Sequence, residues 1–152
     1  MVNKLDISSL IKAYESFSNA LKTASILESD YSEIFYSKEF ARAAVIHNFG
    51  YTYELAWKMM KRYIEMEDRN IKILSRKDLF RIAGEKELIH DFHKWVDFHE
   101  ARNKTSHTYD EDTAEEVYII AKEFEEYVKD FISTLKERIE YDERLDESMG
   151  NH

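Results

Sequence analysis

Hydrophobic residues recur every three or four positions along most of the chain, which is the spacing that places them on one face of an α-helix. Polar segments separate five such runs from one another. The pattern predicts helices over about residues 8–26, 38–66, 75–84, 86–105 and 112–140. Four main helices and one short helix predict an all-α fold, an up-and-down bundle.

The predicted boundaries depend on residue types that cap helices, because a side-chain oxygen can accept from the free backbone N–H groups of a first turn. We expect the short third helix to end near Gly84. The tail over residues 141–152 is acidic and polar, and we expect it to fray. The capping residues that we expect are Ser8 or Ser9, Ser37, Ser75 with Asp78, and Asp112 with Glu115.

The second predicted helix carries the longest apolar stripe before residue 100, and Gly50 interrupts it. A glycine inside a helix costs about 1 kcal/mol relative to alanine. A close helix crossing or a slight bend at this position would explain why it is tolerated. The residues of this stripe are Phe40, Ala44, Val45, Phe49, Thr52, Ala56, Met59, Met60 and Tyr63.

Composition supports the helical prediction and narrows the class of protein. The chain has no proline, three glycines and no cysteine, so a fold rich in tight turns, a disulfide framework and a thiolate metal site are all disfavoured. Its length suits one domain over residues 1–152, with a core over about 8–140. No stretch approaches the roughly 20 apolar residues of a membrane span. With no signal-like apolar run at the N-terminus, we expect a cytoplasmic protein.

Charge is distributed unevenly along the chain. The net charge of −9 counts against a general nucleic-acid binder, and we expect neither DNA nor a membrane as a partner. Residues 57–81 nevertheless hold eight basic and four acidic side chains, whereas residues 110–147 hold five basic and fifteen acidic ones. A basic middle and an acidic last helix therefore occur in one chain.

The most suggestive chemistry lies between residues 100 and 109. Arg102 is always charged and His107 titrates near neutral pH, a pair suited to breaking a phosphodiester bond. His107 would move the proton of an RNA 2′-hydroxyl or of the leaving 5′-oxygen, and Arg102 would stabilise the charged phosphate. Asn103 would orient either group, Ser106 would bind the phosphate or close the helix, and Tyr109 would stand exposed on a turn. This scheme requires no metal and no cofactor.

Geometry restricts how these two groups can meet. Residues five apart are rotated by about 140° on a regular helix, so Arg102 and His107 cannot share one face. They converge if the helix ends between them, or if two copies meet across a two-fold axis. Taken without context, the simpler interpretation is that Arg102 and His107 stabilise a helix end.

Glu54 lies in an aromatic stretch and needs a partner, for which Arg102 is a candidate.

A metal site is the other chemistry that we considered. His90, His93 and His99 occur at spacings that bring two of them onto one helical face. No complete set of ligands accompanies them, so we expect no metal and interpret them as solvated or half-buried histidines.

The sequence resembles the HEPN domain family. Residues 102–109, Arg-Asn-Lys-Thr-Ser-His-Thr-Tyr, match the longer form of its arginine-histidine signature, which ends in tyrosine. Residues 49–58, Phe-Gly-Tyr-Thr-Tyr-Glu-Leu-Ala-Trp-Lys, and residues 105–116 support the match. The chain is similar in particular to small stand-alone members described as nucleotidyltransferase substrate-binding proteins or as HepT-type toxins. The resemblance covers about residues 40–135.

This resemblance implies a helical bundle that forms a homodimer, in which both motifs face one cleft. It implies a metal-independent endoribonuclease in a toxin-antitoxin pair, with Arg102 and His107 catalytic. It also implies a minimal nucleotidyltransferase as partner, which transfers AMP to Tyr109. The alternative is a subunit without turnover that binds the nucleotidyltransferase and a substrate or nucleotide, and a third possibility is a purely structural helical dimer.

The chain departs from the family pattern at three positions. Gly50 replaces an acidic residue, and Asn48 stands where arginine is common. Both lie on the second helix, where they affect contacts with a partner or substrate. Arg76 replaces the usual proline after Ser75, a change that we expect to affect only the start of the third helix.

Overall fold

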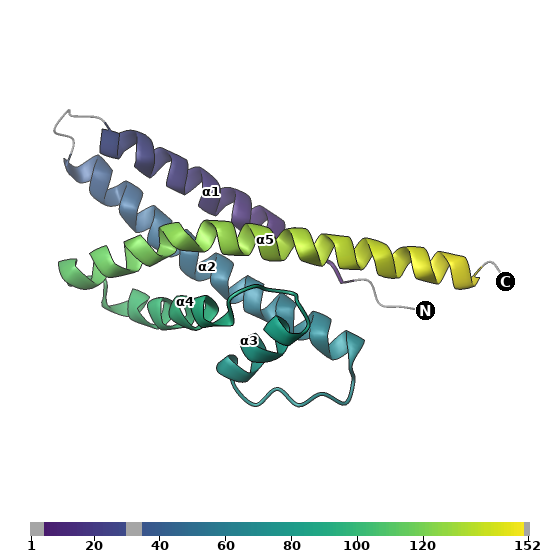
Figure 1. The fold of residues 1–152 in the computed structure, drawn as a ribbon. Coiled ribbons are helices and arrows are strands. Elements are labelled where there is room, and N and C mark those ends of the chain that lie inside the picture. The colour runs from purple at the N-terminus through teal and green to yellow at the C-terminus, as the bar shows by residue number, and fades with distance from the viewer. Residues whose placement is uncertain (1–4, 30–34, 151–152) are drawn as a thin grey trace.

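The protein is a bundle of helices, which confirms the predicted all-α fold (Figure 1). The computed structural model describes residues 5–29 and 35–150. Helices α1 and α2 lie side by side, and α5 crosses them and extends beyond the other helices. The helices are α1 (Ser8–Ser29), α2 (Phe35–Glu67), α3 (Arg76–Glu85), α4 (Phe92–Lys104), the short 3-10 helix η1 (Thr105–His107) and α5 (Glu111–Gly150).

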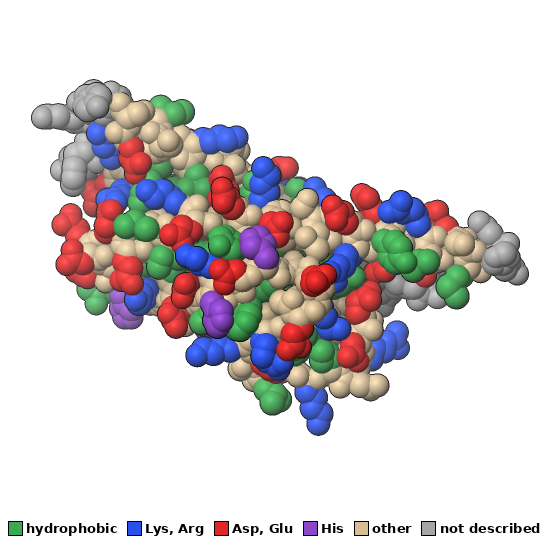
Figure 2. Space-filling model, in the orientation of Figure 1, with side chains coloured by type: hydrophobic (Ala, Val, Ile, Leu, Met, Phe, Trp, Pro, Cys, Tyr) green, Lys and Arg blue, Asp and Glu red, His purple; other side chains and the backbone are tan. Residues whose placement is uncertain are grey.

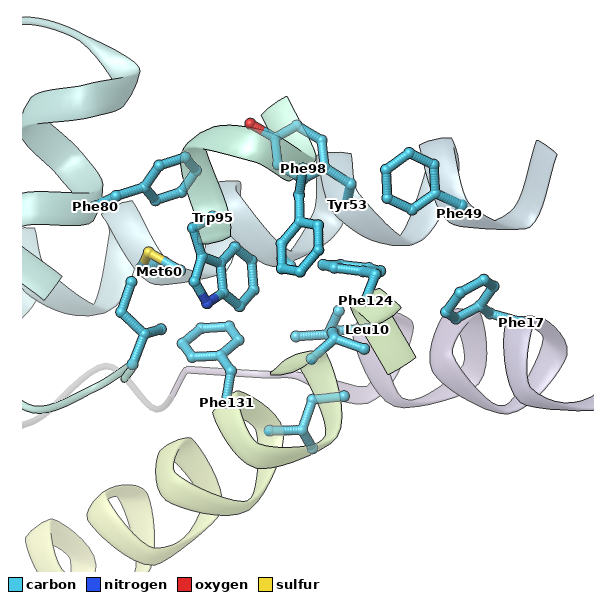
Figure 3. Packing of buried hydrophobic residues seen from close by; sticks show 14 of the residues in the cluster. Leu10, Phe17, Phe49, Tyr53, Met60, Phe80, Trp95, Phe98, Phe124 and Phe131 are labelled. Atoms are coloured by element: carbon cyan, nitrogen blue, oxygen red, sulfur yellow. The ribbon is translucent and has the colours of Figure 1, made fainter. Parts of the chain in front are cut away.

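Aromatic side chains form the centre of the core, around Phe124 of α5 (Figure 3). Phe124 is fully buried, and five rings from α1, α2 and α4 lie with their centroids 5.0 to 6.4 Å from its own. Most of these contacts are tilted or edge-to-face, the arrangements that aromatic pairs prefer. The five rings are Phe17, Phe49, Tyr53, Trp95 and Phe98.

The predicted stripe of α2 is largely confirmed, but two of its members are misplaced. From Val45 to Tyr63 the stripe is buried or half-buried against the core. Phe40 is 74% exposed, and Ala44 is also exposed. Ala41 and Val45, four residues apart, are buried instead, so the packed face of this part of α2 excludes Phe40 and Ala44.

Side-chain caps begin three of the helices, and one of them was predicted correctly. The hydroxyl Oγ of Ser75 accepts from the backbone N–H of Asp78 at 3.0 Å, and Asp78 Oδ2 accepts from the N–H of Leu74 at 3.1 Å. This reciprocal arrangement is a variant of the capping box. It confirms the predicted start of α3.

The predicted caps of α1 and α5 are wrong, because an aspartate slightly earlier in the chain takes the role. Asp6 Oδ1 accepts from the backbone N–H of Ser8 at 2.9 Å. Asp110 Oδ2 accepts from both the N–H and the hydroxyl of Thr113, at 3.2 and 2.7 Å. Asp112 therefore lies inside the first turn of α5.

The predicted connector over residues 27–37 is shorter than expected on both sides. Helix α1 continues to Ser29, and α2 already begins at Phe35. Ser37 consequently lies within α2 and is not its cap. The middle of this connector, residues 30–34, lies outside the described residues.

Helix α4 begins at Phe92, so the prediction that it starts at Lys86 is wrong. The N–H of Leu88 donates to the carbonyl of Ala83 at 2.9 Å, and that of Glu87 to Gly84 at 3.0 Å. This is a Schellman ending, with Glu87 at a φ of 59° in the left-handed position that glycine usually takes. The predicted end near Gly84 is confirmed within one residue, but Gly84 itself stays helical.

Helix α5 continues to Gly150, so neither its predicted end near residue 140 nor the expected fraying of residues 141–150 is correct. Two contacts distant in sequence hold this end of α5, the first just before the added turns and the second within them. Arg138 Nη2 donates to the carbonyl of Lys86 at 2.6 Å, and the Tyr63 hydroxyl donates to Asp142 at 3.4 Å. Within the described ranges, no helix is both long enough and apolar enough to cross a membrane.

Candidate functional site

The motif residues lie where α4 passes into η1 and the turn that leads to α5. Three hydroxyl side chains donate to backbone carbonyls at this helix end, where the regular hydrogen bonds run out. Thr105 donates to the carbonyl of Arg102 at 2.7 Å, Ser106 to that of Asn103 at 3.3 Å, and Thr108 to that of Thr105 at 3.2 Å. The regular helix therefore ends at Lys104, between the motif arginine and histidine.

Arg102 is held in a half-buried position by residues from two elements. Its Nη1 donates to Thr105 Oγ1 at 2.6 Å, and its Nε lies 3.5 Å from Glu54 Oε1 on α2. The predicted pairing of Glu54 with Arg102 is thereby confirmed. The Nε atom is buried and makes no hydrogen bond to any described residue, so part of the donor capacity of this guanidinium is unused.

Gly50 makes this position of Arg102 possible. A Cβ atom at residue 50 would lie 3.2 Å from both Cδ and Nε of Arg102, closer than side chains normally approach. The glycine thus allows a side chain from α4 to lie directly on the backbone of α2. The sequence predicted a close helix crossing or a slight bend at Gly50, whereas the neighbour found there is the side chain of Arg102.

Glu54 also connects Arg102 to a second arginine. Its Oε2 accepts from Trp57 Nε1 at 2.9 Å, and the guanidinium of Arg76 lies over the Trp57 ring, 3.5 Å from the centroid. A planar guanidinium at this distance stacks on the aromatic face. Arg76 therefore does more than begin α3, contrary to the expectation from the sequence. Its place in the basic segment was the only signal of this role.

A second chain of contacts runs from Arg76 through the interior to Asn103. Arg76 Nη1 donates to the hydroxyl of Tyr53 at 3.0 Å, and this hydroxyl lies 2.8 Å from His99 Nδ1. The side-chain amide of Asn103 lies 3.4 Å from His99 Nε2. The side chain of Asn103 consequently contacts His99, and among the described residues it makes no hydrogen bond to Arg102 or His107, the two groups that it was expected to orient.

Electrostatics favour a neutral His99 in this network. Burial lowers its pKa, and the positive charge of Arg76 lowers it further. Burial likewise raises the pKa of Tyr53, which remains a neutral hydroxyl despite the nearby guanidinium. A neutral hydroxyl can accept from Arg76 and donate to a neutral imidazole at the same time. No pattern in the sequence indicated this pairing.

His107, Ser106 and Tyr109 are exposed on the surface. The rings of His107 and Tyr109 meet edge to face with centroids 6.1 Å apart. Tyr109 is 86% exposed on the turn, as predicted. The imidazole of His107 makes no hydrogen bond to another described residue, which leaves both of its nitrogens open to a ligand.

A cavity of about 1100 Å³ lies beside the motif, between α2, η1 and the start of α5. Arg102 and Tyr109 line it, together with Gly50 and Glu54, whereas His107 does not. Six carboxylate residues and three Lys or Arg residues line this cavity, so its field is negative overall. A single chain therefore does not bring Arg102 and His107 together in one cavity.

The three histidines considered for a metal have separate environments. His90 Nδ1 lies 2.9 Å from Asp130 Oδ2, and the ring of His93 packs on Phe92 with centroids 4.1 Å apart. His99 belongs to the interior network described above. In the part of the chain that the structure describes, no three His, Asp or Glu side chains are placed to hold a metal ion together.

Comparison with known families gives a match over most of the chain. Residues 5–137 match a family described as nucleotidyltransferase substrate binding protein like. Over 103 residues the chain is 38% identical to a protein of Haemophilus influenzae described as a probable ribonuclease HepT. That alignment covers 66% of this chain and 70% of the relative.

Two solved structures are similar in fold. One, from Haemophilus influenzae, is described as the substrate-binding domain of a nucleotidyltransferase and superposes with a TM-score of 0.80 at 30% identity. It covers 86% of this chain and 99% of that one. A protein of Thermus thermophilus has a TM-score of 0.63 at 24% identity, covering 81% and 98% of the two chains, and shows the shared fold alone.

Proposed function

The chain belongs to the family of nucleotidyltransferase substrate-binding-like proteins, and from this membership we propose that it is a HEPN-type endoribonuclease, the toxin of a toxin-antitoxin pair. The proposal rests on where the motif residues Arg102 and His107 lie. Arg102 is fixed over Gly50 by Glu54 and Thr105, and His107 stands exposed in the adjoining 3-10 helix. The relative described as a probable ribonuclease supports the reaction class.

The proposed reaction is transfer of the RNA phosphate to its own 2′-oxygen. His107 takes the proton of the 2′-hydroxyl, and the 2′-oxygen attacks the phosphorus. The bond from phosphorus to the 5′-oxygen breaks, and that oxygen receives a proton, which leaves a 2′,3′-cyclic phosphate and a 5′-hydroxyl. Arg102 binds the phosphate and stabilises the charge that develops on its oxygens.

A homodimer completes the proposed site. His107 lies outside the cavity that Arg102 lines in its own chain. A two-fold axis near η1 would place the exposed His107 of each copy against the motif of the other, because the same surface is used on both sides. Arginine and histidine would then converge without any change in the fold of one chain.

Tyr109 is the proposed site of control by a partner nucleotidyltransferase. The side chain is 86% exposed, and its hydroxyl makes no hydrogen bond to a described residue. The phenolic oxygen attacks the α-phosphorus of ATP, pyrophosphate leaves, and the phenolic proton passes to solvent. The added phosphate would stand beside a cavity in which carboxylates already outnumber Lys and Arg residues, and it would repel the phosphates of RNA.

A second candidate function is a subunit without turnover that binds a nucleotidyltransferase and presents a substrate or nucleotide to it. The net charge of −9 and the carboxylate-rich cavity favour this alternative, since both oppose the approach of RNA. The family description also supports it.

RNA cleavage in the presence of a chelator distinguishes the two functions. The wild-type protein is expected to cleave single-stranded RNA, and His107→Ala is expected to lose at least about a hundredfold in rate. His93→Ala, another exposed histidine outside the motif, is the matched control and should keep wild-type activity. Equal residual cleavage by wild type and His107→Ala would remove the ribonuclease and leave the binding subunit.

The modification is tested separately by mass spectrometry. The protein is incubated with ATP and a nucleotidyltransferase encoded beside its gene. A mass increase of one AMP per chain is expected in the wild type and none in Tyr109→Phe, which keeps the ring. An unmodified wild type, or modification that persists in Tyr109→Phe, would contradict this part of the proposal.

A further inference from the structure

A group of cations along α2 and α3 lies outside the lining of the cavity described above, and one of them, Arg76, also contacts Tyr53 and Trp57. The group extends from the second half of α2, through the connector, to the first turn of α3. Figure 2 shows Lys and Arg side chains at the edge formed by α3 and the connector, whereas Asp and Glu side chains gather over the start of α5. We define the basic face as the Lys and Arg residues between 57 and 81 that form no ion pair with a described residue, which leaves out Lys61 and Arg81: Lys58, Arg62, Arg69, Lys72, Arg76 and Lys77.

The cations of the basic face are not neutralised by their surroundings. Among the residues that the structure describes, none of the six forms an ion pair with a carboxylate. By contrast, three cations closer to the motif form ion pairs with glutamates of α5: Arg42, Lys94 and Lys104. Arg62, Lys72 and Lys77 are also exposed, so their charges are available to a ligand.

The basic face is continuous with the candidate site. Arg76 stacks on Trp57, Trp57 donates to Glu54, and Glu54 pairs with Arg102. Glu54, Lys58 and Arg62 also follow each other at intervals of four along α2. They therefore form one stripe, about 12 Å long at 1.5 Å per residue, that leads away from Arg102.

A polyanion suits this surface better than a protein does. Protein interfaces usually have an apolar centre with aromatic residues and few charges. Leu74 is the only large hydrophobic side chain between residues 57 and 81 that is highly exposed in the described structure. A row of unpaired cations with little apolar surface is instead the pattern that follows a phosphate backbone.

We propose that the basic face binds the backbone of a single-stranded RNA outside the cleavage site and guides the chain toward Arg102. This inference rests on the proposed ribonuclease function and names the part of the protein that holds its substrate. Carboxylates outnumber Lys and Arg residues by six to three in the cavity at the motif, so the RNA needs an attractive surface elsewhere to offset that negative field. The substrate is then an RNA long enough to contact both regions.

Salt dependence of binding tests the proposal. A fluorescein-labelled single-stranded RNA of mixed sequence is titrated by anisotropy with His107→Ala protein, which cannot cleave it, in about 50 to 200 mM KCl. The test variant adds Arg62→Gln, Lys72→Gln and Lys77→Gln. The matched control adds Lys94→Gln, Lys122→Gln and Lys129→Gln, three cations on α4 and α5.

The test variant is expected to bind about tenfold or more weakly at the lowest salt concentration. Its slope of log K against log salt should become shallower by about 2, because three phosphate contacts at about 0.7 each are lost. The control should keep both values. Exposed substitutions of this kind usually change stability by less than about 0.5 kcal/mol, and thermal melting of each variant verifies that it is folded.

The outcomes separate this inference from the proposed function. An unchanged slope in the folded test variant overturns the basic face as an RNA site, even if the wild type cleaves RNA. A reduced slope supports the basic face, and wild-type protein that then fails to cleave in chelator overturns the ribonuclease alone. Sedimentation of the test variant gives a further outcome. If the variant no longer forms a dimer but binds RNA unchanged, the basic face is an interface between two copies of the chain, and the proposal is overturned.

Discussion

The side chain of Arg102 packs on the backbone of Gly50, with its Cδ and Nε atoms 3.2 Å from where a Cβ atom of that residue would stand, a tighter contact than most. The contact joins the motif of α4 to the backbone of α2. It explains a glycine within a long helix, where alanine would otherwise be favoured by about 1 kcal/mol. The glycine therefore serves the position of the arginine and not the stability of the helix.

Gly50→Ala is expected to reduce RNA cleavage by at least about tenfold without unfolding the protein. The new methyl group displaces the guanidinium, while the helix itself gains from the better helix former. Steady-state cleavage rates and the melting temperature measure the two effects. Wild-type cleavage by Gly50→Ala would show that the position of Arg102 over α2 has no role.

Gly84→Ala is the control for this change. The nearest atom to a Cβ there is Phe92 Cβ at 3.6 Å, an ordinary contact, and the residue lies within α3. Unfolding by urea should show a stability gain of up to about 1 kcal/mol. Cleavage should not change, since Gly84 is remote from the motif.

Glu54→Gln tests the carboxylate that pairs with Arg102. The amide can still accept from Trp57, but the charge opposite the guanidinium is removed. The two side chains are each about one-third exposed, so we expect a stability loss below about 1 kcal/mol. The cleavage rate should fall at least about tenfold, because Arg102 is no longer held in one orientation.

The control for this carboxylate is Glu65→Gln on the same helix. Glu65 pairs only loosely with Lys61, at 3.9 Å, and it lies away from the motif. Its variant should cleave at the wild-type rate. A loss of cleavage in both variants would indicate a general effect of charge and not a positioning role for Glu54.

His99 gives the stability of the protein a defined dependence on pH. Its folded pKa is lowered by burial and by Arg76, so the unfolded chain binds more protons near the usual value of 6.5. The contribution of the neutral histidine is therefore complete above the unfolded pKa of 6.5 and is lost as the pH falls toward the folded pKa. Urea unfolding between about pH 8 and pH 5 measures it.

His99→Gln should weaken that dependence, because glutamine does not titrate. The variant is expected to lose less stability than the wild type between about pH 7 and pH 5. His93→Gln, which removes an exposed histidine, should follow the wild-type curve. Parallel curves for wild type and His99→Gln would contradict the assigned role of His99.

Phe124→Ala should destabilise the fold by about 3 to 5 kcal/mol, because it leaves a cavity among five aromatic rings. Phe40→Ala is the comparison, since Phe40 is 74% exposed although the spacing of α2 predicts it in the core. Its effect should stay within about 0.5 kcal/mol. Urea denaturation of both variants checks the predicted difference.

Much of the fold could be predicted because helical periodicity and capping are local properties of the sequence. The seam of α5 through Val117, Phe124 and Phe131 is buried as its spacing indicates. The cap at Ser75 was also predicted correctly. The wrong helix boundaries arise where several nearby residues can fill the same role. Asp110 caps α5 in place of Asp112, and Glu87 adopts the left-handed conformation expected of glycine.

Residue types and short spacings were enough to predict that the chain is helical and that a helix ends between Arg102 and His107. The folded chain was needed to show that Arg102 lies on Gly50 and pairs with Glu54, and that Arg76 stacks on Trp57. These contacts join separate helices, and their geometry is set by how the whole core packs. A periodic pattern assigns a residue to a face of its helix, whereas packing decides which residue of another helix it meets.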